Sequence, residues 1–281
     1  MLRFISASLS LLALSTGIAC GQTTAGAGST IVFPVIAATA TYTTEVFVRN
    51  PNITPITLDV TFYEASNSSS PGTYPCLPVS VPANRTVPFT LAAQCVLAGG
   101  SHFGMLVLTD SASEQLALFY AYSRTQTAGG NGFSIEGFPI GNFSGAPSDV
   151  IGLKRQAAAP VYQSNCFVGA LGESIDYQIV LRDGGTGATI GNPISGTLAP
   201  FQMLRFLDVF GPAGANAPAG DYNNVRANFS VSNANMPAYV GLCTVRKARS
   251  WVPISASPSL RTPPTIGRNA SRASGRTVAE P

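Results

Sequence analysis

Two similar stretches of sequence, about 120 residues apart, constrain the fold of this chain more than any other feature. The first, Thr43–Glu64, reads TTEVFVRNPNITPITLDVTFYE, and the second, Gln163–Arg182, reads QSNCFVGALGESIDYQIVLR. In the first stretch, apolar and polar residues alternate, which is typical of strands that bury one face. Asn50-Pro51 in the middle of the first stretch favours a turn. We therefore predict a strand–turn–strand hairpin in each stretch, and a chain built from two similar β units.

The composition agrees with an all-β chain. Hydrophobic residues make up 45% of the sequence and charged residues only 10%, against about 25% charged in an average soluble protein. The 28 glycines and 21 prolines supply frequent turns, and no long stretch has the 3.6-residue period of an amphipathic helix. Short strands at close spacing are typical of sandwiches. We predict two tandem β-sandwich domains, at residues 29–144 and 149–252.

The first 19 residues have the features of a secretory signal peptide. Arg3 is followed by an apolar run that ends in small residues, and the run is short for the alternative, a membrane anchor. Cys20 stands where a bacterial lipoprotein carries its acylated cysteine, although Gly17-Ile18-Ala19 lacks the usual leucine three residues before it. We predict a chain exported to the periplasm or the extracellular space, with lipidation of Cys20 as the minority alternative and no transmembrane segment in the mature chain.

Four further cysteines predict two disulfides, because an even number in an exported chain is typical of a disulfide framework. They are Cys76, Cys95, Cys166 and Cys243. Three connectivities are open, and the repeat favours Cys76–Cys95 and Cys166–Cys243, since each bond then closes within one unit. The cysteines form no CxxC pair, and His102 is the single histidine, so we expect no metal site and no cofactor.

The charge distribution argues against nucleic acid as a partner. The formal net charge is +3, but residues 22–252 hold 11 basic and 12 acidic residues, which leaves no basic footprint. The excess of arginine lies in the last residues, 253–281, a Ser-, Pro- and Gly-rich stretch that we predict to be a disordered basic tail. An alternative role for this tail is contact with an anionic surface.

Catalytic candidates are few. His102 follows Gly99-Gly100-Ser101 in a predicted loop, and no GxSxG nucleophile motif accompanies it. Glu45, Asp59 and Glu64 fall in the predicted first hairpin, where two of them could approach as the carboxylate pair of a glycosidase. The expected reading is a solvated histidine and scattered surface acids, and so a protein that is not an enzyme. A hydrolase that depends on His102 is the alternative.

Aromatic residues suggest a second function class. A carbohydrate-binding module presents exposed rings to sugars, although strand alternation is expected to bury several of the rings in this chain. The candidates are Tyr63, Tyr74, Tyr120, Tyr122, Phe133 and Phe138.

Three short motifs resemble secreted bacterial β-sandwich repeat proteins of unassigned activity: Phe47-Val48-Arg49-Asn50-Pro51, Leu198-Ala199-Pro200 and Leu207-Asp208-Val209-Phe210. The placing of Cys166 and Cys243 in two distant strands resembles the inter-sheet disulfide of immunoglobulin-like domains, although Trp251 is not on the middle strand. These resemblances imply immunoglobulin-like sandwiches and an exported structural or adhesive protein of the cell envelope or extracellular space. They carry over no functional residue, and the ligand, the protein or glycan partner and the oligomeric state stay open.

Overall fold

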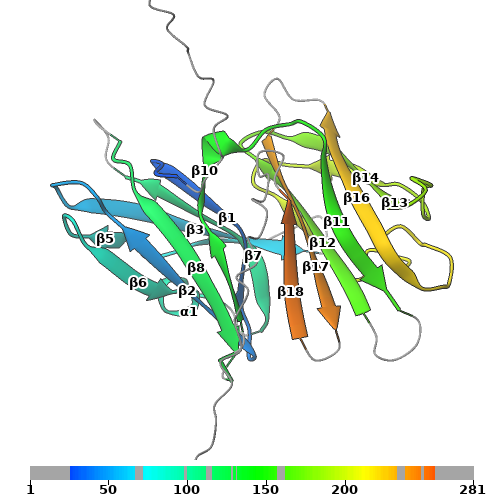
Figure 1. The fold of residues 1–281 in the computed structure, drawn as a ribbon. Helices are drawn as coiled ribbons and strands as arrows, with labels where there is room; N and C mark the ends of the chain where they lie inside the picture. Colours follow the sequence, from blue (N-terminus) through cyan, green and yellow to red (C-terminus); the bar gives the residue numbers. More distant parts are fainter. Residues whose placement is uncertain are drawn as a thin grey trace, which may run out of the picture.

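A computed structural model describes residues 26–66, 72–97, 100–111, 116–127, 129–130, 132–156, 162–232, 238–247 and 250–256. The fold is all-β, as predicted. Hydrogen bonds link 14 strands into one folded sheet, and four more strands form a second sheet. Figure 1 shows two lobes, an N-terminal half coloured blue to green and a C-terminal half coloured green to orange.

The N-terminal half, residues 26–142, is a sandwich of two strand layers. One layer has the order β5-β3-β7-β1 and the other β6-β2-β8-β9. The elements are β1 (Thr30–Ala38), β2 (Tyr42–Arg49), β3 (Ile56–Ser66), β4 (Thr73–Pro75), β5 (Val79–Val81), β6 (Thr86–Thr90), α1 (Leu91–Gln94), β7 (His102–Asp110), β8 (Tyr120–Thr127), β9 (Gly132–Glu136), β10 (Phe138–Pro139) and η1 (Ile140–Asn142). Alternate residues such as Val46, Val48, Leu58 and Phe62 fill the core between the layers.

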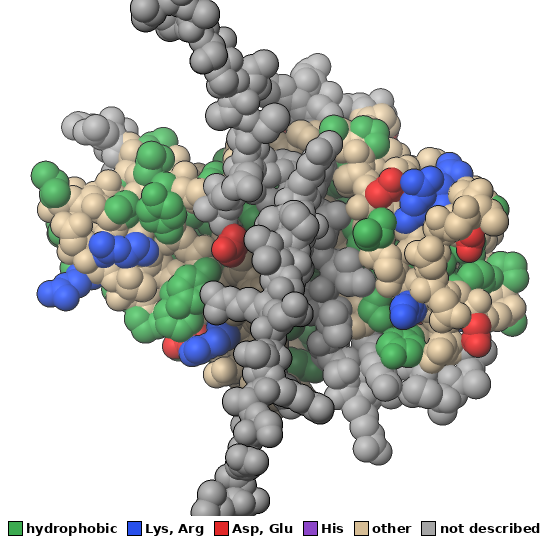
Figure 2. All heavy atoms as spheres, viewed as in Figure 1, with side chains coloured by type: hydrophobic (Ala, Val, Ile, Leu, Met, Phe, Trp, Pro, Cys, Tyr) green, Lys and Arg blue, Asp and Glu red, His purple; other side chains and the backbone are tan. Residues whose placement is uncertain are grey.

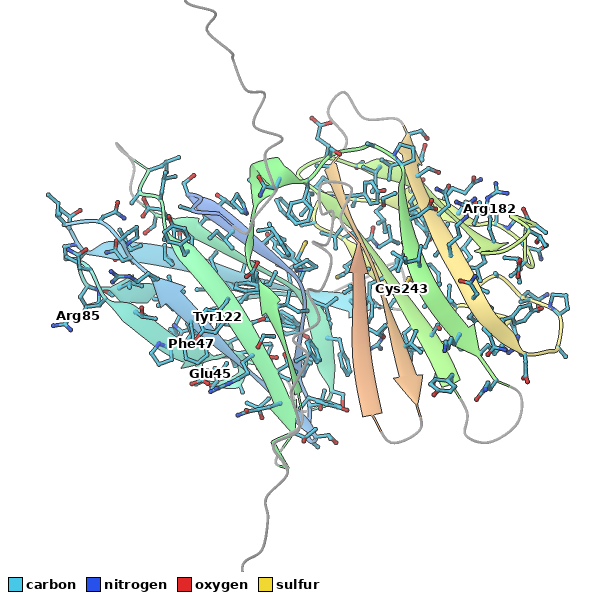
Figure 3. All side chains as sticks on the ribbon, in the orientation of Figure 1. Glu45, Phe47, Arg85, Tyr122, Arg182 and Cys243 are labelled. Carbon is cyan, nitrogen blue, oxygen red and sulfur yellow. A yellow bond between two sulfur atoms is a disulfide. The ribbon has the colours of Figure 1, made fainter. Side chains whose placement is uncertain are left out.

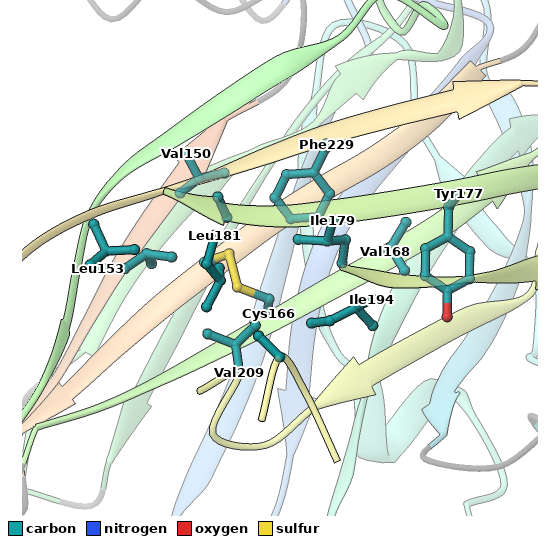
Figure 4. Close-up of a cluster of buried hydrophobic side chains, with 14 of the residues drawn as sticks. Val150, Leu153, Cys166, Val168, Tyr177, Ile179, Leu181, Ile194, Val209 and Phe229 are labelled. Carbon is teal, nitrogen blue, oxygen red and sulfur yellow. A yellow bond between two sulfur atoms is a disulfide. The ribbon is translucent and has the colours of Figure 1, made fainter. Parts of the chain in front are cut away.

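The C-terminal half, residues 148–256, is built in the same way from layers β14-β13-β16-β11 and β15-β12-β17-β18. Its strands are β11 (Ser148–Arg155), β12 (Tyr162–Leu171), β13 (Ile175–Asp183), β14 (Ile194–Leu198), β15 (Met203–Phe206), β16 (Tyr222–Ser232), β17 (Ala238–Lys247) and β18 (Ser250–Ala256). Figure 4 shows part of the core, where Ile179, Leu181 and Phe229 surround the disulfide of Cys166.

The strand orders of the two halves correspond element by element, and one polar contact is common to both. In the N-terminal half the buried Thr44 hydroxyl donates to the Ala37 carbonyl (2.7 Å) and accepts from the Ala37 N–H (3.0 Å). In the C-terminal half the Ser164 hydroxyl makes the same pair of bonds with Lys154, at 2.8 and 3.0 Å. Each hydroxyl fastens the second strand of its half to the first.

The predicted hairpins are wrong. Strand β2 pairs with β6 and β8, whereas β3 pairs with β7, β4 and β5, so the chain crosses from one layer to the other between them. Asn50 holds this crossing: it is fully buried, and its side-chain amide donates to the carbonyls of Thr54 and Val81. The second similar stretch, Gln163–Arg182, behaves in the same way. Strand β12 pairs with β15 and β17, whereas β13 pairs with β14 and β16.

The halves are joined through a shared core, which the sequence reading did not anticipate. A short parallel bridge pairs β15 with the end of β3, at Met203↔Ala65 and Leu204↔Ser66. A third hydrophobic cluster packs the β1/β3/β7 layer on the β12/β15/β17 layer, with Val32, Met105, Phe167 and Leu242 among its members. Burial of this apolar surface stabilises the pair of sandwiches as one body.

Both predicted disulfides are present, Cys76–Cys95 and Cys166–Cys243. The second differs from the immunoglobulin arrangement: Cys166 and Cys243 are register partners on neighbouring strands of one layer, whereas the immunoglobulin bond joins two sheets. The strand order also differs, because β1 pairs with β7 along most of its length, whereas the first immunoglobulin strand lies beside the second.

The ends of the chain are partly outside the described residues. The predicted signal peptide, Cys20 and residues 257–281 fall there. Strand β18 runs to Ala256 and pairs with β17, so the prediction of a disordered tail from residue 253 is wrong for residues 253–256. In the part of the chain that the structure describes, no helix is both long and apolar enough to cross a membrane.

Candidate functional site

The outer layer of the N-terminal half presents an array of aromatic and charged side chains to solvent. Its members alternate with the core residues of β2, β8 and β9, so they all point away from the sandwich interior. We call this array the aromatic face; it consists of Glu45, Phe47, Arg49, Tyr120, Tyr122, Arg124 and Glu136. Figure 2 shows hydrophobic side chains on the front of the N-terminal lobe, flanked by basic and acidic ones.

At the centre of the aromatic face, Phe47 and Tyr122 stack. They are register partners across β2 and β8, with ring centroids 4.6 Å apart and planes at 4°, and Figure 3 shows them side by side. The Arg124 guanidinium lies 5.4 Å from the Phe47 ring centroid and forms an ion pair with Glu45 at 2.7 Å. The array is therefore ordered by its own contacts before any partner binds.

A hollow of about 220 Å³ lies beside this stack. Tyr120 and Tyr122, which are 46% and 45% exposed, form part of its wall together with Ala121 and Gly137. Arg49 and Glu136 also line it. Among the described residues these two charges form no ion pair, so a partner that reaches the hollow meets one cation and one anion.

The C-terminal half buries the equivalent face. Phe167 and Leu242 are register partners across β12 and β17, as Phe47 and Tyr122 are across β2 and β8. Phe167 is 2% exposed and Leu242 is 1% exposed, because the β1/β3/β7 layer of the N-terminal half packs on them. The same layer of the sandwich thus serves as an interface in one half and faces solvent in the other.

Only two of the six aromatic candidates, Tyr120 and Tyr122, belong to the exposed face. Tyr63 stacks on Phe201 of the other half at 5.0 Å, and Phe138 is buried in the cluster between the halves. Phe133 lines a small apolar cavity beside Phe167 and Val35. Phe47 was not identified as a site residue from the sequence. Its position between the core residues Val46 and Val48 in an alternating strand was a usable signal, because it places the Phe47 side chain on the outer face of the sheet.

His102 lies in a polar cluster at the edge of the N-terminal sandwich and not in a loop, which corrects the prediction. It is the first residue of β7 and is buried. Its Nδ1 lies 2.9 Å from Glu64 Oε1, while the Tyr74 hydroxyl donates to Glu64 Oε2 at 3.1 Å. The bond to the carboxylate, followed by burial and the negative charge of Glu64, raises the pKa of Tyr74. The cluster ties β3, β4 and β7 together.

An open groove of about 650 Å³ borders this cluster. Two of the reactive groups that line it are already engaged. Cys95 is in a disulfide, and the Thr44 hydroxyl contacts Ala37 and Thr125. The His102–Glu64 pair resembles the base and orienting acid of a hydrolase, and its hydrogen bond also links β7 to β3.

The three acidic residues among which a glycosidase pair was considered do not lie side by side in the structure. Glu45 pairs with Arg124 on the outer layer, Glu64 contacts His102, and Asp59 is exposed on β3. Because β2 and β3 lie in different layers, the hairpin that was expected to bring them together does not exist. Among the described residues, no group of three histidine, cysteine or acidic side chains is placed to hold a metal ion.

Comparison with known proteins adds no function, since the sequence matches no protein-family model and no curated protein.

Proposed function

We propose that this chain is an exported, non-catalytic scaffold that binds another macromolecule through its aromatic face, as a structural or adhesive component outside the cytoplasm. The observation that carries the proposal is the ordered array of Phe47, Tyr122 and Arg124 on a solvent-exposed sheet. Tyrosine and arginine are, with tryptophan, the residue types most enriched at the energetic centres of protein interfaces. A rigid sheet that presents them loses little side-chain entropy on binding.

Three further observations support the proposal. Two disulfides in a chain of this size are typical of oxidising compartments outside the cytoplasm. The corresponding strand orders and the shared Thr44 and Ser164 contacts support an origin by duplication of one sandwich unit. Burial of Phe167 and Leu242 supports the view that this layer of the unit is suited to packing against a protein surface.

The proposal is tested by adhesion. Microspheres coated with the mature chain are applied to cells of the native host, next to microspheres coated with the Phe47→Ser/Tyr122→Ser variant. We expect the wild-type protein to increase attachment and the variant to lose most of that increase. Ile151→Ser, which changes an exposed apolar residue of the C-terminal half, is the matched control. Wild-type attachment no higher than that of albumin-coated microspheres would contradict the proposal.

A carbohydrate-binding module is the second candidate, and the hollow between Tyr120, Tyr122, Arg49 and Glu136 favours it. The geometry of the stack argues against it. Sugars bind to the faces of aromatic rings, and Tyr122 and Arg124 already lie against Phe47. A glycan array separates the two candidates: specific glycan binding that is lost in Tyr120→Ala would favour the carbohydrate-binding function.

A further inference from the structure

The charges of the aromatic face have a self-complementary arrangement. Arg49 is the register partner of Tyr120 across β2 and β8, and Glu136 is the register partner of Tyr122 across β8 and β9. The cation and the anion therefore lie on opposite sides of β8 and are offset by two residues along the strands. The midpoint of the line that joins them falls over β8, between Tyr120 and Tyr122.

We propose that a second copy of this chain docks on the aromatic face, so that the protein forms a two-fold symmetric dimer. A two-fold axis that lies in the plane of the face and crosses the line from Arg49 to Glu136 at its midpoint and at a right angle exchanges these two positions. Arg49 of each copy then meets Glu136 of the other, as an isologous interface requires. The dimer rests on the proposed function, because it identifies the partner of the surface proposed there.

The remaining residues of the face fit such a partner. Near the axis lie Tyr120 and Tyr122, whose exposed rings supply apolar area at the centre of the interface. The hollow next to them offers space for a tyrosine of the opposing copy. Arg124 and Glu45 neutralise each other within one copy, so they place no unpaired charge in the interface.

The internal junction of the chain supplies an independent argument. There, the equivalent layer of the C-terminal half packs face to face on another sheet of this protein, through Phe167, Val240 and Leu242. Sheet-on-sheet packing is therefore a contact that this sandwich already makes. The exposed aromatic face is its counterpart, with charges of both signs in place of part of the apolar surface.

The test is a charge-swap experiment on the mature, disulfide-bonded chain, with the molar mass measured by sedimentation and light scattering over a range of protein concentrations. The wild-type protein is expected to dimerise. Arg49→Glu and Glu136→Arg, each alone, bring like charges together and are expected to weaken self-association about tenfold or more. The double variant Arg49→Glu/Glu136→Arg restores both pairs and is expected to dimerise again. An equimolar mixture of the two single variants is expected to form a heterodimer.

Arg85→Glu is the matched control. Arg85 is exposed at the turn before β6, outside the aromatic face, and its substitution is expected to leave the dimer unchanged. Circular dichroism checks that each variant is folded. A wild-type chain that stays monomeric, or single variants that neither the double variant nor the mixture rescues, would overturn the dimer. If the wild-type chain is monomeric but still mediates adhesion, the dimer is wrong and the proposed function stands.

Discussion

Phe201 stacks on Tyr63 across the boundary between the two halves, with ring centroids 5.0 Å apart and planes at 14°. Phe201 has a φ of 58°, a conformation that bulky residues rarely adopt. The turn that precedes β6 has Asn84 in the equivalent place, with a φ of 54°. The C-terminal half thus keeps a strained phenylalanine where its counterpart has a residue that tolerates the conformation, and the stack on Tyr63 supplies the compensating contact.

Substitution of Phe201 by glycine separates the strain from the stack. Glycine relieves about 1 kcal/mol of backbone strain but loses the aromatic contact and its burial, worth about 2–3 kcal/mol. We expect Phe201→Gly to lower the free energy of unfolding by about 1–2 kcal/mol, as measured by urea unfolding. Asn84→Gly, which removes no such contact, should change stability by only a few tenths of a kcal/mol. A stabilised Phe201→Gly protein would show that the stack contributes less than the strain costs.

The hydrogen bonds of the buried Thr44 hydroxyl, which Ser164 repeats in the other half, predict a second effect on the free energy of unfolding. Thr44→Val keeps the shape of the side chain but removes the partner of both the N–H and the carbonyl of Ala37. Because Thr44 is buried, water cannot replace the lost bonds, and we expect a loss of about 2–3 kcal/mol. Hydrogen exchange at the Ala37 amide should accelerate in parallel. Thr44→Ser retains the hydroxyl and should lose about 1 kcal/mol or less, with exchange at Ala37 almost unchanged.

The sequence predicted an all-β fold and the disulfide pairs but not how the strands pair. Alternation in β2 and β3 shows that each strand buries one face. It does not show whether two successive strands lie side by side in one layer or face each other across a core, because both arrangements bury the same residues. The deciding element is Asn50, whose side chain bonds to Thr54 and Val81 at the crossing between layers. The bond to Val81 joins residues 31 positions apart, and it leaves no local sequence signal.

The junction between the halves was missed for a related reason. The outer surfaces of both units were predicted to be exposed to solvent. The signal was present in β7 and β17, where GMLVL and YVGLC are apolar at consecutive positions. Continuous apolar runs are typical of strands that are buried on both faces. The aromatic face could be predicted only in part. Tyr120 and Tyr122 can be identified from the sequence. Which residues lie beside them depends on the strand order, and these residues are Arg49, Phe47 and Glu136.

Tyr239 gives the fold a pH dependence at the alkaline end. Burial raises the pKa of Tyr239 above 10.0, against the lowering effect of its hydrogen bond with Ser148. Its hydroxyl lies 2.7 Å from Ser148 Oγ and 3.1 Å from the Ala146 carbonyl oxygen. Because the pKa of Tyr239 is raised in the folded state, the contribution of this residue to the free energy of unfolding is complete below the unfolded pKa near 10. That contribution is lost as the pH rises through the folded pKa.

We therefore expect Tyr239→Phe to lower the free energy of unfolding at neutral pH by about 1–2 kcal/mol and to reduce its decline above pH of about 10. Urea unfolding of the wild-type and variant proteins across the alkaline range measures both effects. Phenylalanine fits the site, because the strand position equivalent to Tyr239 in the N-terminal half is the buried Phe119. Tyr120→Phe, on the exposed face, is the control. Parallel stability curves for the wild-type and Tyr239→Phe proteins would contradict the assignment.

The two disulfides are expected to contribute unequally. The bond between Cys166 and Cys243 spans 77 positions and the bond between Cys76 and Cys95 spans 19. A longer closed loop removes more entropy from the unfolded chain, and loop closure gives about 4.5 kcal/mol for the first bond and about 3 kcal/mol for the second. The first is also buried in the core of the C-terminal half, so its removal leaves a cavity that adds to the loss.

The paired variants Cys166→Ala/Cys243→Ala and Cys76→Ala/Cys95→Ala test this order by urea unfolding without reductant. We expect the first pair to lose more stability than the second by about 1–2 kcal/mol. Unfolding of the C-terminal half exposes its junction with β1, β3 and β7. Loss of the Cys166–Cys243 bond should therefore increase proteolysis at the junction, whereas loss of Cys76–Cys95 should act mainly near α1. An equal loss in both pairs would mean that the unfolded chain is compact enough for loop length not to matter.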